Sequence, residues 1–364
     1  MKIVHTEASC GWGGQEIRIL EEARGLAARG HEVQLLCAPE SRILQEAPRF
    51  GVTATALPIA RKRLPGFFAM RRWLAANPVD VINTHSSTDS WLAALACKTL
   101  AKAPVIVRTR HISAPVSLNP STRWLYLGAT KHIVTTGEAL RQTLIEVNGY
   151  PSEVLTSVPT GIDPERYSPG DRGAARQALE KSGIAADGPL LAIVSTLRSW
   201  KGHVYLLEAL AGMPGIKLLV VGEGPYQPTI EQKVAELGLQ DRVFLVGQQQ
   251  DVVPWMRAAD VFVLPSYANE GVPQAVLQAM MTGLPVVSTT VGAIAEAVDD
   301  RVTGRLVPPR EVEALRAALT ALLADPQQAR GMGAAGRERA LARFSRNAML
   351  DRMEAIFSRA AAGN

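Results

Sequence analysis

The feature that most constrains the fold is an alternation of short apolar runs with helical patterns, which occurs twice along the 364-residue chain. In the first half, strand-like runs at 2–5, 33–37, 79–82, 105–107 and 133–135 are each followed by a segment of helical character. This alternation is typical of stacked βαβ units, which build a parallel sheet covered by helices. The first half is therefore predicted to be a doubly wound α/β domain.

The alternation breaks between Val158 and Pro189, where prolines and glycines are frequent, as in a linker. It restarts with runs at 191–194, 218–221, 243–246, 261–264 and 286–288. Single cores stop growing at about 250 to 300 residues, so a chain of this length is expected to form two domains. We place the boundary near Ser168, which gives an N-terminal domain at 1–168 and a C-terminal domain at 169–344.

The composition limits the class of protein. With 47% hydrophobic and 20% charged residues, the chain is typical of a packed globular protein and not of a disordered, collagen-like or coiled-coil one. It has no apolar run of about 18 residues and no signal-peptide pattern, which predicts a cytoplasmic protein. Cys10, Cys37 and Cys97 are widely spaced, which argues against a disulfide framework and a zinc site. The net charge of +5 favours anionic ligands or surfaces.

Ligands of doubly wound sheets bind beyond the carboxyl ends of the strands, so a cleft between the domains is the expected site. The most specific segment follows the run at 261–264, where a loop ending in Glu270 leads into a helix. The free N–H groups at the start of a helix suit a phosphate, and Glu270 can accept hydrogen bonds from hydroxyls. A sugar nucleotide fits both features, whereas the alternative is a plain βαβ unit with a surface glutamate. The expected binding residues of this segment are Gly271, Val272, Pro273, Gln274 and Gln278.

Two cations, Arg198 and Lys201, follow the run at 191–194. They are suited to neutralising a diphosphate as it becomes a leaving group, although isolated basic residues are more often solvated surface charges. Gly222 and Gly224 form a short turn after the next run and are a weaker candidate, because they lack the spacing of a dinucleotide fingerprint.

In the first half, Gly13 and Gly14 lie between the first strand and its helix, where glycine permits close approach of a ligand or of the sheet. His111 follows the run at 105–107 and is expected to reach the cleft, where it can donate to a phosphate or a sugar hydroxyl. His85 is a second candidate. A structural role for either histidine stays open.

The segment from Arg61 to Trp73 interleaves five cations with aromatic residues. It suits peripheral contact with an anionic membrane or with a lipid-linked acidic glycan. The alternative is a helix that buries Phe67, Met70 and Leu74 while its arginines face water. Nucleic acid is not an expected partner, because no nucleic-acid-binding motif accompanies the charge.

Together these segments resemble the retaining GT-B glycosyltransferases of family 4 over nearly the whole chain. The resemblance rests on the Gly13-Gly14-Gln15-Glu16 turn, Thr160-Gly161-Ile162-Asp163, Lys201-Gly202, Val221-Gly222-Glu223-Gly224 and the block from Ala259 to Val287. It implies two Rossmann-like domains facing a deep cleft, with a nucleotide-sugar donor on the second domain and a glycan or lipid-linked acceptor on the first. It further implies retention of anomeric configuration, a role in bacterial cell-envelope polysaccharide or lipopolysaccharide synthesis, and a final helix, 345–364, that returns to the first domain.

The resemblance makes Lys201, Arg198, Glu270 and His111 the catalytic candidates. Two positions depart from the family pattern: Gln278 replaces a second acid, usually assigned to the ribose hydroxyls, and Thr196 stands where an arginine is usual. Arg198, three residues before Lys201, can take over that function. Gln278 can still bond a hydroxyl, but without a charge.

The sequence has no Asp-x-Asp triplet and no cluster with metal-ligand spacing, so neither a metal nor a cofactor is expected. No carboxylate nucleophile is evident for a two-step retention, and the resemblance implies a front-face displacement instead. One alternative is a GT-B-like sugar-nucleotide epimerase that has no glycan acceptor. Another is a two-lobed ligand-binding protein, which the missing export signal disfavours. The incomplete glycine fingerprint disfavours an NAD-dependent enzyme.

Overall fold

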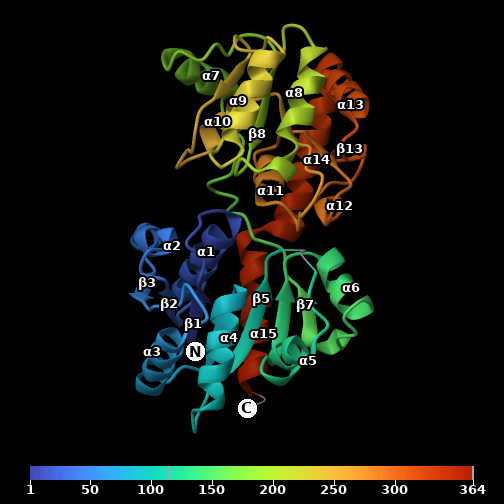
Figure 1. Ribbon diagram of the computed structural model, residues 1–364. Helices are drawn as coiled ribbons and strands as arrows, with labels where there is room; N and C mark the ends of the chain where they lie inside the picture. Colours follow the sequence, from blue (N-terminus) through green and yellow to red (C-terminus); the bar gives the residue numbers. More distant parts are fainter. Residues whose placement is uncertain (113–114, 363–364) are drawn as a thin grey trace. The chain divides into compact units, whose positions relative to one another are not determined.

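The computed structural model describes residues 1–112 and 115–362, and the chain divides into two compact units, which we describe separately (Figure 1). The first unit contains Met1–Gly161 and the C-terminal segment from Arg346, and the second contains Ile162–Ser345. The division precedes the boundary drawn near Ser168 because the intervening residues pack with the second unit. The amide of Ile162 donates to the Phe344 carbonyl at 2.8 Å, and Tyr167 lies in the second core.

The first unit is built on a seven-stranded parallel sheet in the order β3-β2-β1-β4-β5-β6-β7. Its strands are β1 (Lys2–Glu7), β2 (Glu32–Cys37), β3 (Thr53–Ala56), β4 (Val81–Thr84), β5 (Val105–Arg110), β6 (His132–Thr135) and β7 (Leu155–Ser157). The connecting helices are α1 (Gly14–Ala28), α2 (Arg42–Glu46), α3 (Leu64–Ala76), α4 (Ser87–Lys98), α5 (Pro120–Arg123) and α6 (Glu138–Glu146).

The second unit repeats this plan with six parallel strands in the order β10-β9-β8-β11-β12-β13. Its strands are β8 (Leu190–Val194), β9 (Lys217–Val221), β10 (Val243–Leu245), β11 (Val261–Leu264), β12 (Val286–Thr289) and β13 (Gly304–Val307). The helices are α7 (Arg172–Lys181), α8 (His203–Ala211), α9 (Gln227–Glu236), α10 (Val253–Ala258), α11 (Gln274–Met281), α12 (Ile294–Ala297), α13 (Val312–Ala324) and α14 (Pro326–Phe344).

The central strands of both sheets are buried on their two faces. All four residues of β11 and all four of β4 are buried, as expected for parallel strands covered by helices on both sides. The predicted fold class, two doubly wound α/β domains, is confirmed. In each sheet the strand order reverses once, between β1 and β4 in the first unit and between β8 and β11 in the second. Such reversals are where ligands of this fold class bind.

The last helix, α15 (Arg346–Ala362), packs within the first unit although it follows the second unit in sequence. Met353 and Phe357 of α15 are fully buried in a cluster with Ile3 of β1. A side chain at Gly25 of α1 would come within 2.5 Å of Leu350, so glycine allows α1 and α15 to approach closely. The C-terminal helix is therefore part of the first core. Gly363 and Asn364, which the sequence-based helix includes, lie outside the described residues.

This packing predicts that Phe357→Ala lowers the free energy of unfolding of the first unit by about 3 to 5 kcal/mol, because it leaves a cavity in the core. The matched control is Phe68→Ala on α3, where the ring is 61% exposed and the expected change is about 0.5 kcal/mol or less. Urea denaturation of both variants measures the two losses. Equal losses would contradict the placement of α15 in the core.

Candidate functional site

The reversal point of the second sheet brings together two of the predicted catalytic residues. Lys201 lies in the loop after β8, in a short helical turn, η4 (Ser199–Lys201), and Glu270 lies in the loop between β11 and α11. The Lys201 Nζ and Glu270 Oε1 atoms are 2.6 Å apart. The two loops meet because β8 and β11 are adjacent parallel strands whose carboxyl ends lie on the same edge of the sheet.

Several contacts hold the Glu270 carboxylate in place. Its side chain is only 5% exposed, and Oε1 also accepts a hydrogen bond from the Ser266 hydroxyl at 2.6 Å. Thr289 donates in turn to the Ser266 carbonyl at 2.5 Å. Lys201 is more open, at 18% exposed. Since a lysine ammonium carries three donors, Glu270 can orient Lys201 while other N–H bonds serve a ligand.

Glycines allow the loops around this pair to pack against one another. Gly202 has φ 80°, and a Cβ atom there would collide with the Pro265 carbonyl. Gly222, with φ 136°, and Gly224 lie just as close to the carbonyls of Ser195 and Leu197. Backbone packing therefore explains these glycines, while ligand contact at Gly222 and Gly224 stays a prediction. Gly292 has a similar role that was not predicted from the sequence: with φ 59°, it packs on the Glu270 carbonyl.

Helix α11 starts immediately after the Glu270 loop. Gly271, Val272 and Pro273 connect Glu270 to Gln274, the first helical residue, so Pro273 is the residue just before the helix. A proline side chain has no oxygen with which to cap the helix. The positive end of the α11 dipole therefore opens into the same loop as the Lys201–Glu270 pair, an arrangement that favours an anion.

Arg198 and Gln278 are not part of the Lys201–Glu270 contact. Arg198 is exposed, and its guanidinium lies 5.8 Å from the centre of the Trp200 ring. Gln278 is buried in α11 and donates a hydrogen bond to the Tyr167 hydroxyl at 3.0 Å. Tyr167 could not be predicted from the sequence, because a contact over 111 positions gives no local signal. The expected contact of Gln278 with a ribose stays a prediction.

His203, the first residue of α8, adds a neutral polar group to this region. It is buried, and its Nε2 atom lies 3.2 Å from the Ser195 hydroxyl. Burial, followed by the charge of Lys201, lowers the pKa of His203 to about 4. The imidazole is therefore uncharged at neutral pH, and Lys201 supplies the positive charge beside it.

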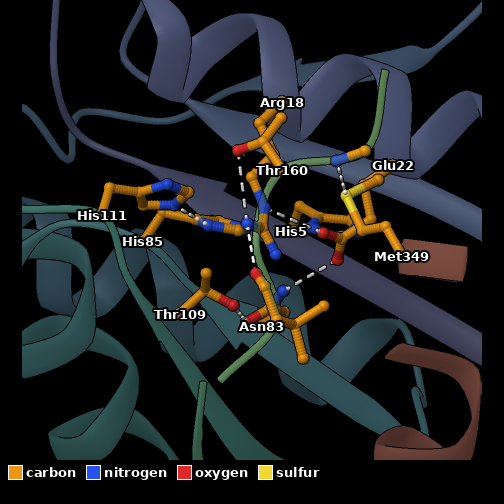
Figure 2. A network of polar contacts seen from close by, with 11 residues as sticks. His5, Arg18, Glu22, Asn83, His85, Thr109, His111, Thr160 and Met349 are labelled. Carbon is orange, nitrogen blue, oxygen red and sulfur yellow. Dashed lines mark hydrogen bonds and ion pairs between the residues drawn. The ribbon is translucent and has the colours of Figure 1, made fainter. Parts of the chain in front are cut away.

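At the reversal point of the first sheet, His111 is the end of a chain of three histidines (Figure 2). His85 Nδ1 lies 2.8 Å from His111 Nε2, and His85 Nε2 lies 2.9 Å from His5 Nδ1. His5 comes from β1, His85 follows β4, and His111 follows β5. His111 and His85 were candidates from the sequence, but His5 had no signal because it lies within an apolar strand.

The histidine chain lies beside a buried ion pair. Arg18 of α1 is fully buried, with its Nε atom 3.5 Å from Glu22 Oε2, and it donates to the Val158 carbonyl at 2.7 Å. Burial, followed by the charge of Arg18, lowers the pKa of His5 to about 3. Burial also lowers the pKa of His85 and of His111. All three rings are therefore neutral at pH 7.

Gly13 and Gly14 lie at the start of α1, and Gly13 has φ −176°, an extended conformation open to any residue. Backbone conformation therefore does not require glycine at position 13. The close approach of a ligand that was predicted for both glycines stays a prediction.

The basic segment from Arg61 to Trp73 lies at α3. The helix buries Met70 and Leu74, as the core alternative expected, whereas Phe67 is only half-buried. The cations of the segment are exposed. It also leaves Leu64 and Phe68 71% and 61% exposed, one turn apart on the helix. Apolar and basic side chains thus share an exposed surface of the first unit. In the parts of the chain that the structure describes, no helix is long and apolar enough to span a membrane.

Comparison with known proteins gives matches in both halves. The family described as Glycosyltransferase Family 4 matches residues 12–166, and Glycosyl transferases group 1 matches residues 175–339. A D-inositol 3-phosphate glycosyltransferase of Nocardia farcinica is 31% identical over 88% of this chain and 79% of its own length.

A further relative is the GDP-mannose-dependent alpha-(1-6)-phosphatidylinositol monomannoside mannosyltransferase of Mycolicibacterium smegmatis. It is 36% identical over 52% of this chain and 53% of its own. Among solved structures, Anabaena Alr3699/HepE in complex with UDP-glucose has the same fold, with a TM-score of 0.87 and 20% identity over 98% of this chain and 99% of that chain.

The loop packing predicts that Gly202→Ala destabilises the second unit by about 3 kcal/mol or more, since overpacking adds to the strain of a left-handed residue. Gly215→Ala is the matched control, because Gly215 has φ 78° but faces open space. It is expected to cost only about 1 to 2 kcal/mol. Equal losses in thermal or urea unfolding would show that the contact with Pro265 contributes nothing.

Proposed function

The chain belongs to the group 1 glycosyltransferases, and from this premise we propose that it moves a sugar from a nucleoside diphosphate to a hydroxyl of a glycan or lipid-linked acceptor, with retention of configuration. The observation that carries the proposal is the contact between Lys201 and Glu270 at the reversal point of the second sheet. A cation, an acid and a helix N-terminus meet there, and these are the groups that a diphosphate and a sugar hydroxyl require.

In the proposed reaction, the bond between the anomeric carbon and the β-phosphate oxygen breaks, and the acceptor oxygen bonds to that carbon on the same face. The departing phosphate takes the proton of the acceptor hydroxyl. Negative charge grows on the diphosphate as the bond breaks, so Lys201 and the start of α11 stabilise the transition state. Arg198 is the proposed second cation. No divalent ion and no cofactor is needed in this scheme.

Glu270 has two functions in this proposal. Its ion pair orients Lys201, and its carboxylate accepts a hydrogen bond from the transferred sugar. Gln278 is proposed to contact the ribose, with Tyr167 holding its amide in place. The backbone at Gly271 and Val272, beside the start of α11, is proposed to line the phosphates. His111 of the first unit is proposed to bond an oxygen of the substrates.

The names of the relatives support particular substrates. The mannosyltransferase is described as GDP-mannose-dependent, and the HepE structure holds UDP-glucose, so a GDP-sugar or UDP-sugar is the proposed donor. Inositol 3-phosphate and phosphatidylinositol monomannoside both carry phosphate, which makes an anionic acceptor of the cell envelope a reasonable proposal for a chain of net charge +5. An epimerase is not favoured, because these relatives are named as transferases.

We expect Lys201→Ala to lower turnover by a factor of about 10² to 10³, the scale for losing one preorganised group that stabilises developing charge. The control is Lys233→Ala on α9, whose ammonium pairs with Glu208 at 2.9 Å. A thermal-shift screen of UDP, GDP, ADP and their sugars identifies the donor, since a ligand of the native state raises the melting temperature. Wild-type turnover in a folded Lys201→Ala protein would exclude Lys201 from the mechanism.

The exposed α3 surface is proposed to hold the enzyme on the cytoplasmic face of an anionic membrane. Leu64 and Phe68 would enter the interface while the surrounding cations meet lipid phosphates. This location suits a lipid-linked acceptor.

We expect Phe68→Ser to reduce sedimentation with vesicles containing phosphatidylglycerol by about tenfold relative to the wild type. Vesicles of pure phosphatidylcholine should bind neither the wild type nor the variant. Val147→Ser, at another exposed apolar position of the first unit, is the control and should bind like the wild type. Equal binding of all three proteins would overturn the membrane proposal and leave the transferase proposal intact.

A further inference from the structure

We infer that His5 and His85 are positioning residues that fix the proton of His111 on its Nδ1 atom, so that His111 presents an N–H donor to the substrates. The inference rests on the proposed function for its consequence in catalysis. The placement of the proton depends only on the buried chain of rings shown in Figure 2.

The contacts run in one direction through the three rings. The first joins His5 Nδ1 to His85 Nε2 at 2.9 Å, and the second joins His85 Nδ1 to His111 Nε2 at 2.8 Å. A neutral imidazole has one donor and one acceptor nitrogen. If His5 donates to His85, then His85 must donate to His111. The chain therefore has only two self-consistent neutral arrangements, in which the protons are either all on Nδ1 or all on Nε2.

Burial keeps the three histidine rings neutral, and the rings lie close to one another. His5 is fully buried and His85 almost so, and their ring centres are 5.2 Å apart in a stacked arrangement. His85 and His111 have centres 5.1 Å apart. The positive charge of Arg18 further disfavours protonation of each ring. The three rings therefore share three N–H protons, and no fourth proton is present to give a charged arrangement.

The surroundings of His5 decide between the two arrangements. Its Nε2 atom is buried and has no hydrogen-bond partner among the described residues. Phe357 packs edge-on to the His5 ring, with ring centres 6.4 Å apart. The positive charge of Arg18 also acts on the His5 ring and disfavours a proton there. A proton on Nε2 would be a buried donor without an acceptor, near a positive charge. A bare lone pair there is less costly, because orphaned N–H groups are the rarer defect in proteins and the cation attracts the lone pair.

The proton of His5 therefore lies on Nδ1 and is donated to His85. His85 then carries its own proton on Nδ1 and donates it to His111 Nε2. His111 Nε2 is an acceptor inside the chain, so the proton of His111 lies on Nδ1. His111 is thus a hydrogen-bond donor to substrate oxygens and not a general base. This agrees with the proposed reaction, in which the departing phosphate takes the proton of the acceptor hydroxyl.

The direct test is long-range ¹H–¹⁵N correlation NMR of the histidine side chains in the full-length wild-type protein at pH 7. We expect the pattern of a ring protonated at Nδ1 for His5, His85 and His111. Protonation at Nε2 in these rings, or a mixture of both forms, would overturn the inference. This measurement needs no substrate, so its result does not depend on whether the protein is a transferase.

A pair of variants tests the effect on catalysis. His5→Phe keeps a ring but removes the donor, and we expect kcat to fall by about 10- to 100-fold, the scale known for losing the partner that orients a metal-bound histidine. His5→Asn places an amide donor near the former Nδ1 and should restore kcat to within about threefold of wild type. The NMR pattern of His111 should be mixed in His5→Phe and restored in His5→Asn.

The matched control is His132→Phe, because His132 is a half-buried histidine of the same unit that bonds Thr156 at 2.8 Å and not the chain. Its kcat and the NMR pattern of His111 should remain as in the wild type. Equal loss in His5→Phe and His5→Asn, with the wild-type NMR pattern kept, would make His5 a packing residue only. If no nucleotide sugar is turned over by the wild type, the proposed function fails while the NMR test still decides the proton placement.

Discussion

The reversal of strand order in each sheet is the constraint on which the rest of this protein depends. Parallel strands send their carboxyl ends to one edge of the sheet, and the loops that follow the two strands at the reversal both begin at that edge. In the second unit this brings the loops after β8 and β11 together, and with them Lys201 and Glu270. In the first unit the same geometry aligns His5, His85 and His111 across three neighbouring strands.

The two units use this geometry for different electrostatic purposes. The second unit holds a cation against a buried carboxylate, beside a helix N-terminus, and in the proposed reaction this cation lies where anionic charge develops. The first unit buries neutral imidazoles whose pKa values are lowered by desolvation. This difference agrees with the proposed reaction, in which a cation stabilises the departing phosphate and that phosphate, not a histidine, takes the proton of the acceptor.

Glycine positions show how much of the candidate site could be predicted. The Lys201-Gly202 loop and the Glu270 segment could be identified because their residue types are local and their spacing is short. The reasons for the glycines could not, since Gly202 packs against Pro265 and Gly292 against Glu270 only once the loops are folded. Tyr167 and His5 were missed for the same reason: their partners Gln278 and His85 are distant in sequence.

The sequence by itself determined the doubly wound fold, because apolar runs with helical spacers have few other ways to bury both faces of a parallel sheet. It also determined which loops carry cations, acids and histidines, since these follow the strands directly. Only the tertiary structure decided which of them meet: Lys201 with Glu270 but not Arg198, and His111 with His85 and His5. Contacts of this kind depend on which strands are neighbours and on what surrounds each side chain, and neither is encoded within a short stretch of sequence.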